Sequence, residues 1–395
     1  MTGKIILIVL VILLGLIIII PFVLNIVGIN ILQLGSIGGG TERLEEAIVA
    51  RSLDGGKEWG NVSLSETKKI SFPSRILRHA FHTADPTVIF LGSRSSGLWK
   101  SVNGGAAWTK MADASGLLDP RADVYDIVIS PSRPEIMYLA VFQNKKGRVL
   151  RSDDGGQSFK EIYFVTSNRF VVFDLYLDPF DYNHVFLVNG QGGILETWNG
   201  GRTWKVVRWF TEAVEKILVN SLNLREMFIV TAGDSLFKSV DGGSNWASLR
   251  VGEWVNQGAM PGIVPPPLNP PIASPRLNPI GGFSRRDLIR TIILDPNNFF
   301  TLYVGSTEGL FRSRDGGFTW TRMEVLIPPE ALPVEAVAVH PNFSNIIFVG
   351  AGSQLHRTDD GGANWSFQDL PINSRVQSLY IQPLNPQVMF ATFAR

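Results

Sequence analysis

Apolar residues recur with one spacing along most of the 395-residue chain. Counted back from a repeated proline, they stand at positions −7, −4 and −2, as Val124, Ile127 and Ile129 do before Pro131. The same spacing precedes Pro179, Pro296, Pro341 and Pro383, and it also precedes Ser221. A turn and a second apolar run follow, and then a Gly-Leu-aromatic-basic stretch. Short apolar runs bounded by turn residues predict strands, so each unit is expected to contribute four of them.

A tight-turn motif, [S/T]-x-[D/N]-G-G-x-x-[W/F], separates the third and fourth strands of each unit. Its seven copies begin at Ser52, Ser101, Ser152, Thr197, Ser239, Ser313 and Thr358, and are 49, 51, 45, 42, 74 and 45 residues apart. Gly-Gly supplies the positive φ angles of the turn, and the acidic or amide side chain caps its backbone N–H groups. These capping residues, expected to be structural, are Asp54, Asn103, Asp154, Asn199, Asp241, Asp315 and Asp360. A four-strand unit repeated every 40–50 residues predicts an all-β propeller.

The two ends of the repeat predict how the propeller closes. The first box, residues 52–59, has no strand pair before it, and the last strand pair, residues 376–393, has no box after it. Six complete units and these two halves make seven blades, with N-terminal and C-terminal strands sharing the seventh. Such closure removes the exposed sheet edges that an open array would leave.

The first residues predict a membrane anchor. Residues 5–24 contain no charged or strongly polar residue. A helix of this length can span a bilayer. Lys4 precedes this run and no further charge occurs before Glu42, so we expect a cytoplasmic N-terminus and an extracytoplasmic propeller, in a periplasm or at a cell surface. A retained single-pass anchor is favoured over a cleaved signal peptide, because the run is long and no cleavage motif follows it. The predicted division is an anchor at 1–34, a linker at 35–43 and the propeller at 44–395.

A proline-rich insertion, residues 255–284, accounts for the longest gap between boxes. Eight prolines between 261 and 279 predict an extended loop rather than strands. It connects the outer strand of one blade to the inner strand of the next, so it is expected on the face opposite the box turns. Two interpretations stay open: a tolerated surface insertion, or an arm that docks a partner or covers the channel mouth.

Arginines recur where the chain enters the inner strands on that same face. We take them as candidate residues for binding a partner or ligand, because guanidinium groups suit carboxylates and phosphates. The set is Arg75, Arg121, Arg169, Arg285, Arg286, Arg290 and Arg375. The alternative is that they are solvated loop residues.

The chain offers little catalytic or cofactor chemistry. It has no cysteine, its five histidines lack metal-ligand spacing, and its formal net charge of +1 gives no signal for nucleic acid. We therefore assign no catalytic residue, metal or cofactor. Asp126 and Asp174, at position −5 of neighbouring inner strands, are the nearest match to a pair of facing carboxylates. Alternation along the strands instead favours a role as hydrogen-bond acceptors between blades.

The box motif resembles the Asp-box, or BNR repeat, of sialidases, sortilin-type domains, xyloglucanases and photosystem II assembly factors. With its single propeller, region 44–395 is most similar to the photosystem II assembly and stability factors. That resemblance implies an exported, membrane-associated, non-catalytic scaffold that holds a protein partner and uses a basic patch. The competing interpretation is a glycan-binding protein or a glycoside hydrolase of the sialidase or xyloglucanase type. Expected partners are thus the membrane and a protein, with an acidic ligand or glycan as the alternative.

Overall fold

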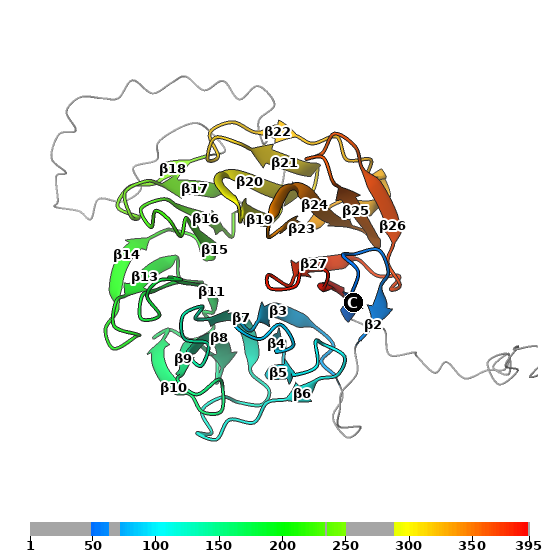
Figure 1. Ribbon diagram of the computed structural model, residues 1–395. Coiled ribbons are helices and arrows are strands. Elements are labelled where there is room, and N and C mark those ends of the chain that lie inside the picture. Colours follow the sequence, from blue (N-terminus) through cyan, green and yellow to red (C-terminus); the bar gives the residue numbers. More distant parts are fainter. Residues whose placement is uncertain (1–48, 63–71, 234, 250–287, 394–395) are drawn as a thin grey trace, which may run out of the picture. The chain divides into compact units, whose positions relative to one another are not determined.

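The computed structural model describes residues 49–62, 72–233, 235–249 and 288–393. These ranges form seven antiparallel sheets of four strands, arranged around a common centre as Figure 1 shows. The strands belong to one compact unit, residues 47–395. The predicted anchor, linker and proline-rich insertion lie outside the described residues. Within the described ranges, no helix is long and apolar enough to cross a membrane.

Each sheet is one blade of the propeller. Blade 1 contains β3 (Ile76–Phe81), β4 (Ile89–Ser93), β5 (Leu98–Ser101) and β6 (Thr109–Lys110). Blade 2 contains β7 (Asp123–Ile129), β8 (Met137–Gln143), β9 (Lys146–Ser152) and β10 (Lys160–Phe164). Blade 3 contains β11 (Val172–Leu177), β12 (Val185–Asn189), β13 (Gly193–Thr197) and β14 (Lys205–Trp209). Blade 4 contains β15 (Val214–Val219), β16 (Met227–Thr231), β17 (Leu236–Ser239) and β18 (Ala247–Ser248).

The remaining blades follow the same plan until the chain ends. Blade 5 contains β19 (Ile289–Asp295), β20 (Asn298–Ser306), β21 (Gly309–Ser313) and β22 (Thr321–Arg322). A 3-10 turn, η2 (Pro329–Ala331), precedes blade 6, which contains β23 (Val334–His340), β24 (Phe343–Ala351), β25 (Gln354–Thr358) and β26 (Ser366–Asp369). The closing blade contains β1 (Val49–Ser52), β2 (Gly60–Asn61), β27 (Val376–Ile381) and β28 (Met389–Phe393).

The closing blade joins the two ends of the described chain. Its strand order is β2-β1-β28-β27, and β1 pairs with β28 from Val49↔Thr392 to Ser52↔Met389. The predicted seven blades, and the predicted closure by N-terminal and C-terminal strands, are therefore confirmed. Pairing strands from opposite ends of the sequence means that the ring closes by hydrogen bonds and packing alone, because the chain has no cysteine.

The seven box turns share one set of hydrogen bonds. The Ser or Thr oxygen accepts the N–H of the second glycine at 2.7–3.0 Å. The Oδ1 of the Asp or Asn accepts the N–H four residues further on at 2.9–3.0 Å. Both glycines have positive φ in every copy, a backbone conformation that glycine adopts without strain. Each turn thus satisfies its own N–H groups through local hydrogen bonds, independently of its packing against other parts of the protein.

A repeated side-chain contact ties neighbouring box turns together. The basic residue just before the box Ser or Thr donates to the carbonyl of the first glycine in the next box, as Arg312 does to Gly361 at 2.7 Å. Arg357 makes the contact to Gly55 at 3.0 Å and so spans the closure of the ring. The other three pairs are Arg51–Gly104 at 2.7 Å, Arg151–Gly200 at 3.4 Å and Lys238–Gly316 at 2.8 Å. A charged donor makes these bonds stronger than neutral ones.

The core is divided among the seven junctions between blades. Each junction holds one cluster of buried apolar side chains that comes mainly from two neighbouring sheets. The second strand of a blade lies between two such clusters, and all five residues of β4, β12, β16 and β28 are buried. This explains why the second apolar run of each unit is continuous rather than alternating.

Candidate functional site

The connections into the innermost strands lie on one face of the propeller, which we call the rim face. The box turns lie on the opposite face, because they join third and fourth strands at the ends where the first strands finish. The sequence predicts seven arginines on the rim face. Two of them, Arg285 and Arg286, lie outside the described residues. The other five are Arg75, Arg121, Arg169, Arg290 and Arg375.

Arg75 belongs to a pair of arginines of blade 1 that lie near Tyr125 of blade 2. Arg75 is exposed just before β3, and its carbonyl accepts the N–H of Arg94 at 3.0 Å. Arg94 lies in the hairpin turn between β4 and β5 and is also exposed. Burial and Asp123 raise the pKa of Tyr125 in blade 2, whereas the two guanidinium groups act to lower it. The structure therefore brings two cations and a phenol together at this part of the rim.

Arg121 and Arg169 mark the entries to β7 and β11. Arg169 is exposed with φ at 71°, and its N–H donates to the carbonyl of Lys145 at 2.7 Å. Lys145 has φ at 62° and is exposed in the hairpin turn of blade 2. Left-handed backbone is uncommon for residues other than glycine, and the backbone hydrogen bond between these two residues joins the entry to β11 with the hairpin turn of blade 2. Arg121 is exposed, and its N–H is capped by Asp119 Oδ1 at 2.7 Å.

Arg290 and Arg375 lie near an acidic residue instead of forming an open basic patch. Burial raises the pKa of Glu335 at the start of β23, and Arg290 and Arg375 oppose that rise. Arg375 is half-buried, and its Nη1 donates to the carbonyl of Leu332 at 2.7 Å. One of its donors is thus used within the protein. The five described arginines form separate groups around the rim rather than one uniform ring.

Asp126 and Asp174 are buried between blades. Asp126 pairs with Arg78 of blade 1 at 2.6 Å and accepts the N–H of Leu175 in blade 3 at 2.8 Å. Asp174 repeats the arrangement one blade further on, with Lys216 Nζ at 2.9 Å and the N–H of Ile217 at 3.0 Å. The prediction that these aspartates are inter-blade hydrogen-bond acceptors is confirmed.

A β-bulge positions these charged side chains. The register of every innermost strand shifts at the same place, for example between Val124 and Asp126, and the residue after the bulge stands at position −5. That position carries charged residues in blades 1–4 and Thr291, Ala336 and Ser378 in the others. Burial raises the pKa of Asp126, while the ion pair with Arg78 opposes that rise.

Sequence reasoning missed the rim residues that come from hairpin turns rather than from strand entries. Arg94 and Lys145 lie in the turns between second and third strands, which reach the same face as the entries. The strand order predicted from the repeat was enough to place those turns there. Across the described ranges, no three His, Asp or Glu side chains gather in a way that suits a metal ion.

Comparison with known proteins places the chain among propellers of two kinds. A family model described as photosynthesis system II assembly factor YCF48 matches residues 155–262. Two solved structures of YCF48 each superpose on 81% of this chain. YCF48 from Cyanidioschyzon merolae does so with a TM-score of 0.58 and 14% identity. YCF48 bound to D1 peptide does so with a TM-score of 0.57 and 14% identity. These matches confirm the predicted resemblance to seven-bladed propellers of the photosystem II assembly factor type.

The second kind comprises xyloglucanases. Xyloglucanase Xgh74A of Acetivibrio thermocellus is 24% identical over 287 residues, which are 69% of this chain and 28% of the enzyme. The GH74 xyloglucanase of Xanthomonas campestris superposes with a TM-score of 0.61 at 15% identity, over 81% of this chain and 51% of the enzyme. The chain therefore spans about a quarter to a half of these enzymes. Likeness at this level of identity establishes the propeller fold that both kinds share.

Proposed function

We propose that the protein is a scaffold that holds a protein partner during assembly, and that the rim face is its binding surface. The proposal rests on the share of each known protein over which the similarity extends. The similarity to YCF48 extends over 94% and 95% of the two YCF48 chains, against 51% of the xyloglucanase. A single propeller accounts for nearly all of the first kind of protein and half of the second. One YCF48 structure is bound to a D1 peptide, which supports a peptide segment as the form of the partner.

The chemistry of the rim supports an acidic partner segment. Arg75, Arg94, Arg121 and Arg169 are all exposed, and Lys145 lies beside the last of them. Guanidinium groups bind carboxylates through paired, charge-assisted hydrogen bonds. Exposed contacts of this kind act mainly on the rate of association and weaken as salt screens them.

We also propose that residues 1–34 anchor the propeller to a membrane with the propeller outside the cytoplasm. The uncharged run from Ile5 to Leu24 and the single Lys4 before it motivate the proposal. An anchored propeller would be held near membrane-embedded partners and so would meet them at high effective concentration.

A glycoside hydrolase is the second candidate, favoured by the xyloglucanase match and by the raised pKa of Glu335. A carboxyl group with a raised pKa is suited to general-acid catalysis. Glu215 holds the same position in β15 as Glu335 holds in β23, one residue before the position −5. If the protein is a hydrolase, replacing Glu335 with Gln should abolish any release of reducing sugar from xyloglucan. If it is a scaffold, the same variant should keep its partner.

Charge reversal on the rim tests the scaffold. The variant Arg75→Glu, Arg121→Glu, Arg169→Glu is compared with the control Arg202→Glu, Arg225→Glu, Arg314→Glu, which reverses three exposed arginines of the box face. Tagged proteins are used to capture partners from solubilised membranes at about 50 and about 300 mM salt, because screening weakens exposed contacts. We expect the rim variant to lose the partners that the parent and the control retain, with the parent losing them at the higher salt. Equal capture by both folded variants would contradict the proposal.

A further inference from the structure

The junction between blade 1 and the closing blade contains a histidine at a core position of the repeat. His79 follows the β-bulge of β3 at the place that corresponds to position −4 in the other units, and it is 4% exposed. The residues at this position in the other six units are also buried, and all are aliphatic: Ile127, Leu175, Ile217, Ile292, Val337 and Leu379. Blade 1 therefore places a titratable ring where every other blade places a hydrocarbon side chain.

Four aromatic rings enclose the imidazole of His79. The ring of Tyr380 in β27 stacks on it, with the centroids 4.9 Å and the planes 25° apart, and the ring of Phe390 in β28 lies at 4.6 Å. Phe81 of β3 lies at 4.9 Å and Trp108 of the second box at 6.2 Å. Both imidazole nitrogens are buried, and neither has a hydrogen-bond partner among the described residues. A neutral imidazole has one N–H donor and one acceptor nitrogen, so leaving both unsatisfied costs stability.

The surroundings of His79 disfavour a positive charge on its ring. Burial lowers the pKa of His79 to about 3, and the guanidinium of the neighbouring Arg78 acts in the same direction. Arg78 is itself paired with Asp126 of blade 2 at 2.6 Å, across the other junction of blade 1. Of the four enclosing rings, that of Tyr380 alone bears a titratable group, a phenol. Protonation would turn both imidazole nitrogens into donors without partners, so the closed junction favours the neutral ring.

The same junction is where the ring closes. Strands from opposite ends of the described chain, β1 and β28, lie on one side of it and blade 1 lies on the other. The Nε1 of Trp108 donates to the carbonyl of Val62 across the junction at 3.1 Å. The apolar cluster that fills the junction includes Val49 from β1, Phe390 from β28 and Leu91 from β4. Packing around His79 thus helps to hold the closing blade to blade 1.

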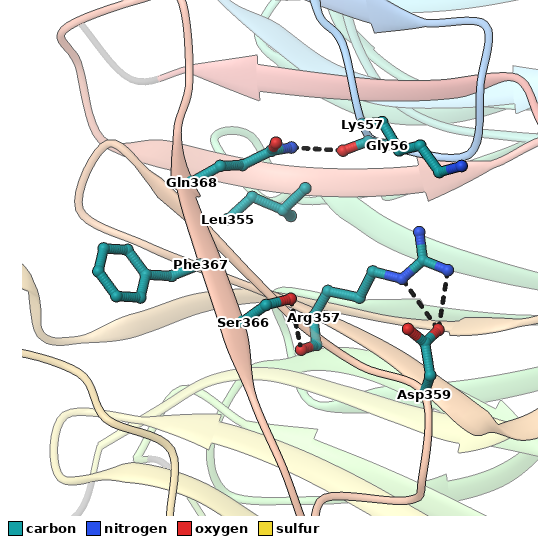
Figure 2. Close-up of a pocket in the computed structure, with 8 residues that line it drawn as sticks. All are labelled: Gly56, Lys57, Leu355, Arg357, Asp359, Ser366, Phe367 and Gln368. Atoms are coloured by element: carbon teal, nitrogen blue, oxygen red, sulfur yellow. Dashed lines mark hydrogen bonds and ion pairs between the residues drawn. The ribbon is translucent and has the colours of Figure 1, made fainter.

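The other side of the closing blade, which faces blade 6, is joined by groups that keep their charge in mild acid. Arg357 donates to the carbonyl of Gly55 at 3.0 Å. The amide of Gln368 donates to the carbonyl of Gly56, as Figure 2 shows. A guanidinium stays charged and an amide stays neutral in mild acid, so these two bonds are retained there. Of the two junctions of the closing blade, the one that contains His79 is therefore the one that mild acid should weaken.

We propose that His79 is a pH-sensitive switch of the ring: when its imidazole is protonated, the junction between blade 1 and the closing blade opens. Water solvates the imidazolium in the open junction, which restores its ordinary pKa of about 6.5. The stability that the neutral ring gives the closed junction is full above pH 6.5 and is lost as the pH falls toward about 3. Opening separates the two ends of the propeller but leaves each blade intact, because the junction joins the faces of two sheets rather than two strands of one sheet.

The test uses the absence of cysteine from the chain. One cysteine is introduced at a fully buried position of one junction, and its reaction with a pyridyl disulfide, which also proceeds in acid, measures how often that junction opens. Each rate is divided by the rate of the urea-unfolded chain at the same pH. The three positions are Val49→Cys in the junction of His79, Ala391→Cys in the junction with blade 6, and Val188→Cys in the junction of blades 3 and 4.

Each cysteine is placed in the full-length parent and in three variants. His79→Ile and His79→Leu introduce the residues that other blades carry at this position. His356→Leu is the matched control, because His356 is also buried, with an Nε2 that has no partner among the described residues, but belongs to blade 6. Protonation of Asp126 acts in the junction of blades 1 and 2, so its effect persists in both His79 variants.

Between about pH 7 and about pH 4 we expect the relative labelling rate of Val49→Cys to rise by about tenfold to about a hundredfold, because opening is favoured about tenfold for each pH unit below about 6.5. The rise at Ala391→Cys and Val188→Cys should stay below about threefold, since each junction opens locally. His79→Ile and His79→Leu should remove the rise at Val49→Cys, and His356→Leu should keep it. The proposal is overturned if Val49→Cys rises no more than the other two probes, or if both His79 variants retain the rise of the parent. Neither result depends on partner binding at the rim.

Discussion

Replacing Asp126 with Asn tests whether the carboxylates of the inner strands hold neighbouring blades together. Asp126 is fully buried, and its carboxylate binds Arg78 at 2.6 Å, the N–H of Ile127 at 2.8 Å and the N–H of Leu175 at 2.8 Å. An amide keeps the shape but has one acceptor oxygen, so it cannot serve both N–H groups and carries no charge for Arg78.

The expected loss follows from these contacts. Breaking a buried ion pair by removing one partner costs about 3–5 kcal/mol. The Arg78 side chain is 29% exposed, so water compensates part of the unpaired charge, and we expect a loss of about 3 kcal/mol in the free energy of unfolding. The measurement is equilibrium denaturation in urea. Asp123→Asn is the control on the same strand, because Asp123 caps an exposed N–H and should cost less than about 1 kcal/mol.

A double-mutant cycle separates the pair from its surroundings. Arg78→Met alone, Asp126→Asn alone and the two together should show a coupling of about 1–3 kcal/mol, because each single change leaves the other group without its partner. If Asp126→Asn proved as stable as the parent, or if the two changes were additive, the inter-blade role of the carboxylate would be refuted.

Three further predictions concern pH and topology. Hydrogen bonds within the turns lower the pKa values of the box aspartates, that of Asp154 to about 2. Their contribution to stability is therefore present above pH 4 and should be lost as the pH falls from about 4 to about 2. Asp154→Ala should make the free energy of unfolding, measured by urea denaturation, depend less on pH in this range. Hydrogen bonds to Glu196 and Asp178 outweigh burial and raise the pKa of His184. The stability that His184 contributes is therefore full below pH 6.5 and is lost as the pH rises through the raised pKa. His184→Gln should remove this pH dependence of stability. Protease treatment of intact cells or spheroplasts should degrade the propeller and spare a cytoplasmic control, and survival of the propeller would contradict the anchor.

The fold was predictable because its signals are local. A box turn closes its hydrogen bonds within eight residues, and the unmatched half-units at the two ends are visible in the sequence. The roles of Asp126 and Asp174 followed from position −5, which recurs in every unit.

Side-chain partners across the junctions were not predictable in the same way. That Arg375 donates to Leu332 depends on how a neighbouring loop packs. His79 occupies an apolar position of β3 and lies 4.9 Å from Tyr380 and 4.6 Å from Phe390, measured between ring centroids. Burial lowers its pKa to about 3, in an environment to which Phe81 and Trp108 of blade 1 contribute as well as the closing blade.

Site-specific photo-crosslinking in cells most directly tests the central claim that the rim face binds a protein partner. A photoreactive phenylalanine analogue replaces Phe170, which is 37% exposed beside Arg169 on the rim, or Phe180, which is 74% exposed in the turn after β11 on the box face. The scaffold account predicts a discrete adduct from position 170 that disappears in the Arg75→Glu, Arg121→Glu, Arg169→Glu variant, and none of that species from position 180. An adduct from position 180 with none from position 170, or a rim adduct indifferent to charge reversal, would contradict it.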